Sequence, residues 1–80
     1  MGRKDWNQTL QEAHDNYTIR VDDASTTVTY IGKALVGSTT SSAQWQIKKL
    51  DTTSGVVINF ADGNDQFDNV WDDRASLTYI

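Results

Sequence analysis

The sequence predicts an all-β fold, a small antiparallel β-sandwich or barrel of about five strands with a short N-terminal helix or arm. Three observations support this class: apolar and polar residues alternate along several runs, turn-forming residues separate these runs, and the chain contains no proline. A chain of 80 residues has room for one domain only. We therefore expect an N-terminal segment over residues 1–15 and a single β-domain over residues 16–80.

The N-terminal segment differs from the rest of the chain in the spacing of its apolar residues. Four of them recur at intervals of four, three and four, which places them on one side of a helix. They are Trp6, Leu10, Ala13 and Tyr17. The segment is too short and too polar to form a stable helix alone. Two interpretations stay open, a short helix that lies on the domain or an arm that becomes ordered on a neighbouring copy.

The next segment changes to a period of two and predicts the first hairpin. Apolar residues occupy every second position from Tyr17 to Val21, which predicts a half-buried strand. Turn-forming residues at 22–25 separate this strand from a second β-rich run at 26–36. Gly32 within the second run indicates a bulge or a close approach of backbone, because glycine otherwise weakens a strand.

A second hairpin is predicted after a polar loop at 37–42. Its first strand is expected at 43–50, with Leu50 out of phase, so that a bulge or a frayed end is predicted there. The residues that share one face of this strand are Ala43, Trp45 and Ile47. A short loop at 51–55 leads to the returning strand at 56–61. The side chains expected to point inward from it are Val56, Ile58 and Phe60.

The C-terminal part follows a turn at 62–65 and has a mixed pattern. Spacings of three and four from Phe67 onward predict a short helical turn near 67–71. Leu77 and a following tyrosine alternate with polar residues, which predicts a closing strand at about 75–80.

Composition and charge exclude several classes of function. The net charge of −4 argues against a nucleic-acid binder, which would normally have a basic face. No apolar run approaches the roughly 20 residues of a membrane span. The chain has no cysteine and His14 is its only histidine, so disulfides and Cys₂His₂-type zinc sites are excluded, and we expect no cofactor. Since so small a domain buries a modest core, we expect partner subunits to supplement its stability.

Several short motifs follow one another through residues 26–80. They are Tyr30-Ile31-Gly32-Lys33-Ala34, Trp45-Gln46-Ile47-Lys48-Lys49, Ala61-Asp62-Gly63 and, most specifically, the run from Trp71 to Tyr79. This series resembles a group of small, mostly uncharacterised proteins encoded by tailed bacteriophages, with residues 1–25 outside the resemblance. The resemblance implies a virion structural protein, such as a capsid decoration, neck, tail or fibre-associated component. It implies no catalytic residue.

The same resemblance sets expectations about partners and location. The partners would be other virion proteins of the capsid, neck or tail, together with further copies of the chain as a homo-oligomer. The protein would be located in the virion, and in the host cytoplasm during assembly. We expect no enzymatic activity, because the only histidine lies in the N-terminal segment and a catalytic pocket is difficult to build in a chain of this size.

An acidic stretch at 62–73 is a candidate metal site. Ca²⁺ prefers several oxygen ligands from a short loop, and the candidates are Asp62, Asn64, Asp65 and Asp68. The spacing does not match an EF-hand, because Gln66 and Phe67 stand where that loop needs Asp or Asn and glycine. The alternative interpretation is a solvated loop of turn-forming residues.

Trp71 leads to an alternative function for the chain. Its acidic neighbours suggest exposure, and an exposed indole beside the acidic 62–73 loop would make a small glycan-binding module, with or without Ca²⁺. In the structural interpretation Trp71 packs over the end of the sheet. Arg74 then pairs with one of the nearby aspartates, a contact of small energy where it is exposed.

The remaining candidate residues would make contacts between subunits. Lys48 and Lys49 form the only internal basic doublet and could contact an acidic surface of a partner, such as the acidic loop of another copy. The alternative interpretation is a solvated strand end. The residues expected at interfaces or anchors are Trp6, Leu10, Lys48, Lys49, Trp71 and Arg74.

Overall fold

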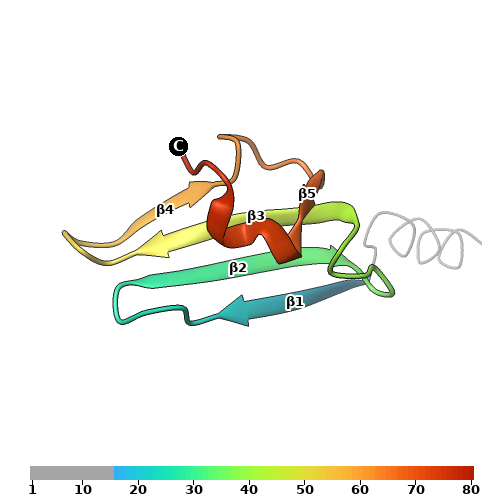
Figure 1. Ribbon diagram of the computed structural model, residues 1–80, viewed down its shortest axis with the longest axis horizontal. Helices are drawn as coiled ribbons and strands as arrows, with labels where there is room; N and C mark the ends of the chain where they lie inside the picture. The colour runs from blue at the N-terminus through green and yellow to red at the C-terminus, as the bar shows by residue number, and fades with distance from the viewer. Residues whose placement is uncertain (1–15) are drawn as a thin grey trace, which may run out of the picture.

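A computed structural model describes residues 16–80, which form an antiparallel sheet with a short helical segment on one side (Figure 1). The elements are β1 (Tyr17–Asp22), β2 (Val28–Leu35), β3 (Ala43–Asp51), β4 (Val57–Phe60), β5 (Asn69–Val70) and the 3₁₀ helix η1 (Trp71–Ser76). The all-β, antiparallel class is confirmed. Within residues 16–80 the strands form a five-stranded sheet, and the structure does not show the closed barrel or sandwich. The predicted N-terminal arm lies outside the described residues.

The sheet is a meander in which β3 has three neighbours. The strand order is β1-β2-β3-β4, and β5 also pairs with β3. β4 pairs with residues 48–51 of β3, whereas β5 pairs with the opposite end, at Ala43 and Trp45. The 62–68 loop joins these two short strands, and the chain then enters η1 (Figure 1).

Side-chain oxygens organise the two hairpin turns. The hydroxyl of Ser25 accepts hydrogen bonds from the backbone N–H groups of Thr27 and Val28, at 3.3 and 3.1 Å. In the second hairpin Asp51 Oδ1 accepts from the N–H of Thr53 at 2.9 Å. Hydrogen bonding from the Thr53 side chain, and then from its backbone N–H, lowers the pKa of the Asp51 carboxyl. Both turns are therefore specified locally by residues that favour turns for this reason.

The core lies between η1 and the middle of the sheet. Trp45 and Ile47 on β3 are fully buried, and the indole ring of Trp71 packs 5.8 Å from that of Trp45, centroid to centroid. The Trp45 Nε1–H donates to the carbonyl of Thr39 at 2.9 Å, so the buried indole keeps a hydrogen-bond partner. The buried apolar residues are Ala34, Trp45, Ile47, Ala61 and Trp71.

Gly32 permits this packing because it has no side chain. A Cβ atom at this position would lie 2.5 Å from Cε3 of Trp71 and 3.1 Å from Cε3 of Trp45. The pairing of β2 with both neighbours continues through Gly32 without a shift in register. Of the two predicted roles for this glycine, the close approach is therefore confirmed and the bulge is wrong.

The C-terminal prediction was displaced along the chain. The helical turn is η1 at Trp71–Ser76 rather than residues 67–71, because β5 extends the backbone up to Val70. The predicted strand at 75–80 is reduced to one bridge between Ala61 and Tyr79. The 3₁₀ helix ends at Ser76 and so takes the first two residues of this predicted strand.

Two predictions about strand phase were also wrong. The ladder of β3 is regular at Leu50, which pairs with Thr29 on one side and Ile58 on the other, so there is no bulge there. The shift in register occurs instead between Ala43 and Trp45. Ile58 does not point to the core, because it shares the face of Leu50 and not that of Trp45.

Candidate interaction surface

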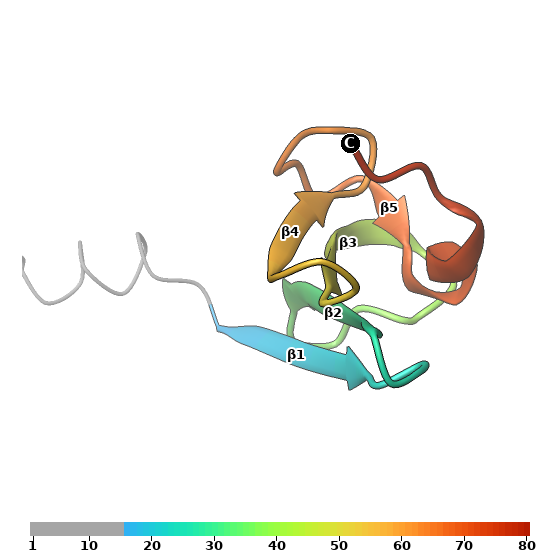
Figure 2. The same ribbon diagram turned by 90° about the vertical axis from the view of Figure 1, so that its left-hand side faces the viewer.

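The two faces of the sheet are covered differently. Residues paired across an antiparallel ladder share a face, so Gly32, Ile47 and Ala61 lie on the same side, under η1. We call this side the covered face. Figure 2 shows η1 and the C-terminal residues on this side of β2 and β3. Among the described residues, the opposite side has no element packed across it.

The opposite side is apolar, and we call it the apolar face. Its exposed residues include Ile19, Val21 and Ile58, whose relative accessibilities are 55%, 65% and 53%. The ladder pairs place the following apolar side chains on it: Tyr17, Ile19, Val21, Ile31, Leu35, Leu50, Ile58 and Phe60. An antiparallel sheet with one face on the core usually has polar residues on the other. An exposed apolar surface of this kind is typical of interaction sites.

Two lysines stand in the centre of the apolar face. Lys33 Nζ lies 4.5 Å from the centroid of the Tyr17 ring, and Lys48 Nζ lies 5.9 Å from that of Phe60. Such cation–π contacts hold the alkyl chains against the sheet and leave the ammonium groups exposed. None of the described ladder positions on this face has a carboxylate. The surface is therefore both apolar and positively charged, although the whole chain is acidic.

A loop borders one end of the apolar face and forms a hollow there. Gln46 Nε2 donates to the carbonyl of Asp65 at 2.8 Å, and the Phe67 ring stacks on Tyr17 with centroids 5.6 Å apart. The hollow has a volume of about 300 Å³. It is lined by Tyr17, Leu35, Ser38, Gln44 and Phe67. Its lining combines polar and apolar side chains, and its size suits one or two side chains of a partner.

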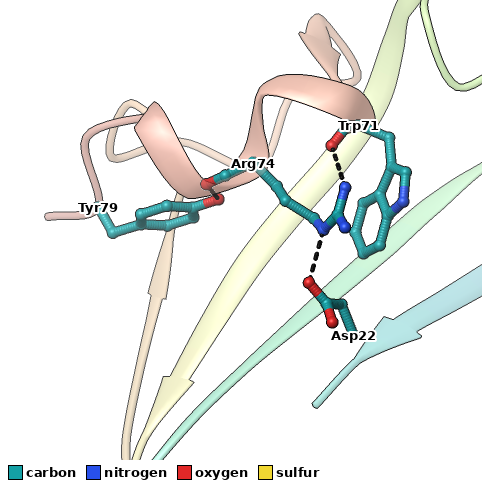
Figure 3. A network of polar contacts seen from close by, with 4 residues as sticks. All are labelled: Asp22, Trp71, Arg74 and Tyr79. Atoms are coloured by element: carbon teal, nitrogen blue, oxygen red, sulfur yellow. Dashed lines mark hydrogen bonds and ion pairs between the residues drawn. The ribbon is translucent and has the colours of Figure 1, made fainter. Parts of the chain in front are cut away.

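On the covered face, polar contacts attach η1 to the sheet (Figure 3). Arg74 Nε donates to Asp22 Oδ2 at 2.8 Å, its Nη1 donates to the carbonyl of Trp71 at 3.1 Å, and its guanidinium lies 4.6 Å from the Trp71 ring centroid. The hydroxyl of Tyr79 donates to the carbonyl of Arg74 at 2.7 Å. This network joins the end of β1 to the C-terminal segment.

The Tyr79 hydroxyl is held in its protonated form by this environment. Burial raises its pKa to about 12, with smaller contributions from Tyr30 and Asp62, while the nearby Arg74 acts in the opposite direction. The neutral phenol is the form that can donate to the Arg74 carbonyl. The shift is therefore consistent with a structural hydrogen bond.

Of the two interpretations of Trp71, the exposed ring of a glycan-binding module is contradicted. The side chain is only 5% exposed, because it lies between Gly32 and the Arg74 guanidinium. An indole covered in this way offers no free ring for a sugar, whereas the structural interpretation placed it over the sheet, as observed. The expected partner of Arg74 was also wrong. Asp22 from β1 takes this role, and not an aspartate of the 62–73 loop.

The other predicted interface residues do not form one site. Lys48 and Lys49 are adjacent on β3 and so point to opposite faces. Lys48 lies on the apolar face, whereas Lys49 lies 5.4 Å from the Tyr79 ring on the covered face. Trp6 and Leu10 lie outside the described residues.

The acidic candidates for a metal site are used in turns. Asn64 Oδ1 accepts from the N–H of Gln66 at 3.0 Å, and Asp68 Oδ1 accepts from the side-chain amide of Asn69 at 3.2 Å. Asp62 has a φ of 60° at the turn after β4 and is exposed, as is Asp65. Across residues 16–80, no three His, Cys, Asp or Glu side chains are grouped to hold a metal ion.

Sequence reasoning missed the apolar face. The signal was present in the second hairpin, where Trp45 and Ile47 have one phase and Leu50 with Ile58 the other. Apolar residues in both phases of paired strands predict that both faces of the sheet are apolar. We had instead interpreted Leu50 as an irregularity of the strand.

Comparison with known proteins adds no relative. No family model, curated protein or solved structure matches this chain. Over the described residues, no helix has the length and apolar character needed to cross a membrane.

Proposed function

We propose that this chain is a non-enzymatic structural subunit of a tailed-bacteriophage virion, which works in multiple copies and docks onto other virion proteins through the apolar face. The observation that carries the proposal is the row of exposed aliphatic residues on a sheet whose other face is already packed. Burial of apolar surface is the main driving force for protein association. A surface of this kind is stabilised when a partner covers it.

The chemistry of the apolar face limits the partner. Lys33 and Lys48 in its centre favour a partner that brings carboxylates along with apolar side chains, since a buried lysine without a partner charge is costly. The hollow beside Phe67 would receive a side chain of this partner. A partner sheet or helix on this face would also supply the second layer that a β-sandwich contains.

The polar groups of the covered face support a structural role. Arg74 and Tyr79, which a catalytic site could otherwise use, are engaged in holding η1 on the sheet. The hydrogen bonds of Arg74 and Tyr79, together with the buried indoles, stabilise one conformation of a small core. A virion component needs this rigidity because each copy presents the same surface to the particle.

Two neighbouring residues of β4 provide a matched test. Ile58 lies on the apolar face and is 53% exposed, whereas Val57 lies on the other face and is 47% exposed. Ile58→Glu should reduce incorporation of a tagged chain into purified virions by at least about tenfold, because an unpaired carboxylate would be buried at the interface. Val57→Glu should be incorporated like wild type. Incorporation is measured by mass spectrometry of the particles.

Two results would contradict the proposal. One is equal incorporation of both variants, which would remove the apolar face as the docking surface. The other is the absence of the wild-type chain from purified particles, which would remove the virion role. Circular dichroism of each variant controls for loss of fold.

A further inference from the structure

The outer edge of β1 offers a row of backbone hydrogen-bonding groups. β1 pairs only with β2 among the described strands. The N–H of Val36 donates to the carbonyl of Asn16 at 3.0 Å, so Asn16 and Val36 form a hydrogen-bonded pair of the ladder. In an antiparallel ladder such pairs alternate. The N–H and C=O groups that point away from β2 therefore belong to Tyr17, Ile19 and Val21.

Within residues 16–80, the edge of β1 has few of the features that usually prevent pairing. Edge strands are commonly protected by charged side chains, proline, bulges, short length or a covering segment, and of these β1 has a charged residue in mid-strand, Arg20. β1 has six residues in an unbroken register with β2 and contains no proline. The opposite edge differs, because β4 has only four residues and the N–H of Asp62 beyond it is bonded to the carbonyl of Thr78.

We propose that β1 pairs antiparallel with β1 of a second copy, about a two-fold axis that passes beside Ile19. In this register Ile19 opposes Ile19 of the second copy, and Tyr17 opposes Val21. Each of the three outward residues then exchanges an N–H···O=C pair across the interface.

The neighbouring registers are less favourable. An axis at Arg20 places the two arginines directly opposite each other, which is a destabilising like-charge pair. An axis at Thr18 pairs Val21 with a residue that precedes the strand, so fewer strand groups are bonded. With the axis at Ile19, Arg20 opposes Thr18 and the apolar residues oppose one another. Isologous pairing of this kind is the usual way in which a homodimer forms.

Pairing through β1 also joins the two apolar faces. A two-fold axis perpendicular to the sheet keeps each face on its own side, so the exposed Ile19 and Val21 of both copies form the centre of one larger apolar surface. The inference thus rests on the proposed function for its purpose, since a wider docking surface serves a subunit that binds in multiple copies. Its geometry rests on β1 alone.

Single cysteines test the register in the full-length chain, which has no cysteine of its own. Ile19→Cys places two thiols directly opposite each other, with Cα atoms about 5.5 Å apart, within the range for a disulfide. Val21→Cys places them four residues out of register, about 13 Å apart. Mild oxidation should therefore give a covalent dimer with Ile19→Cys and little with Val21→Cys. Equal yields from both, or none from either, would overturn the proposed register.

A proline tests the backbone contact. Ile19→Pro removes an N–H that points away from β2, so the fold should persist while the dimer is lost. Ile19→Thr keeps the N–H and the β-branched side chain, and it should still dimerise. The mass in solution is measured by light scattering over a hundredfold range of concentration, with circular dichroism as the control for fold. A dimeric Ile19→Pro variant, or a wild-type chain that stays monomeric throughout, would refute the pairing.

These tests are independent of the docking surface. Ile58 lies on β4, three strands from β1, so Ile58→Glu should leave the dimer intact while it prevents incorporation into particles. If the wild-type chain docks but never dimerises, the pairing is wrong and the proposed function stands. If it dimerises and is absent from particles, the pairing stands and the proposed function is wrong.

Discussion

The two faces of this sheet are built from different residues and have different roles. The covered face places small residues, Gly32 and Ala34, beside the large indoles of Trp45 and Trp71, which interlock into a compact core. The apolar face has aliphatic residues of similar size, such as Ile19 and Ile58, which leave a broad surface. The recesses of the covered face receive bulky rings of the same chain, whereas no described element packs across the apolar face.

This difference also separates stability from binding. The covered face contains the fully buried side chains, so the free energy of unfolding depends mainly on it. The apolar face contributes less, because its residues remain largely exposed in the folded chain. Substitutions on the covered face should therefore lower the free energy of unfolding much more than substitutions on the apolar face.

The largest effect is expected from Trp71→Ala. Removal of a buried aromatic side chain costs about 3–5 kcal/mol, which is most of the stability of so small a domain. The Arg74 guanidinium would also lose the ring against which it packs. Urea denaturation followed by circular dichroism should show a largely unfolded chain. A midpoint close to wild type would mean that the covered face does not hold the fold.

A smaller loss is expected from Gly32→Ala. Replacement of a strand glycine normally favours the strand, by roughly 0.5–1 kcal/mol. Here the new Cβ would meet Trp71 at 2.5 Å, and overpacking of this kind costs about 1–3 kcal/mol. The double variant with Trp71→Leu should lose less stability than the sum of the single variants, as a double-mutant cycle would measure. Simple additivity would show that the two sites do not clash.

A third effect depends on pH and involves Tyr79. The pKa of this residue is raised from 10.0 to about 12 in the folded chain, so between these values the unfolded chain has lost a proton that the folded chain keeps. Stability contributed by Tyr79 is therefore complete below pH 10 and is lost as the pH rises through 12. Comparison with Tyr79→Phe isolates this residue from the other groups that titrate there. Denaturation curves of equal pH dependence in both chains would contradict the assignment.

The smallest effect on stability is expected from Ile58→Thr on the apolar face. Threonine keeps the β-branched shape, and the side chain is already half exposed, so the free energy of unfolding should change by no more than about 0.5 kcal/mol. The same change should weaken docking, because it removes apolar contact area. A stability loss as large as that of Gly32→Ala would show that the two faces do not differ as described.

The sequence was sufficient for the four strands of the meander, but not for β5 or for the orientation of the sheet. Alternation of apolar residues gave the second hairpin, and Gly32 indicated a close approach. Alternation alone cannot decide which face is inside when both are apolar, as with Ile47 and Ile58. That choice is made by Trp71, which reaches the sheet from a distant part of the chain.

The same limit explains the wrong partner predicted for Arg74 and the contradicted alternative for Trp71. Aspartates next to Arg74 in sequence suggested a local ion pair, yet its partner Asp22 is 52 residues away. Neighbouring charges also suggested that Trp71 was exposed, although a 3₁₀ helix turns its side chain toward the sheet. Contacts between distant residues depend on the topology, and local patterns do not contain that information.

The position of the covering segment along the chain has a consequence for folding. Trp71 and Tyr79 follow every residue of the meander in the sequence, so β1 to β4 can pair through local hairpins before the indole of Trp45 is covered. During that interval the partly folded sheet exposes apolar side chains on both of its sides. A partly folded chain in this state is prone to aggregate or to be bound by a chaperone. Arrival of the last helical turn ends this interval and leaves one apolar side for the mature protein.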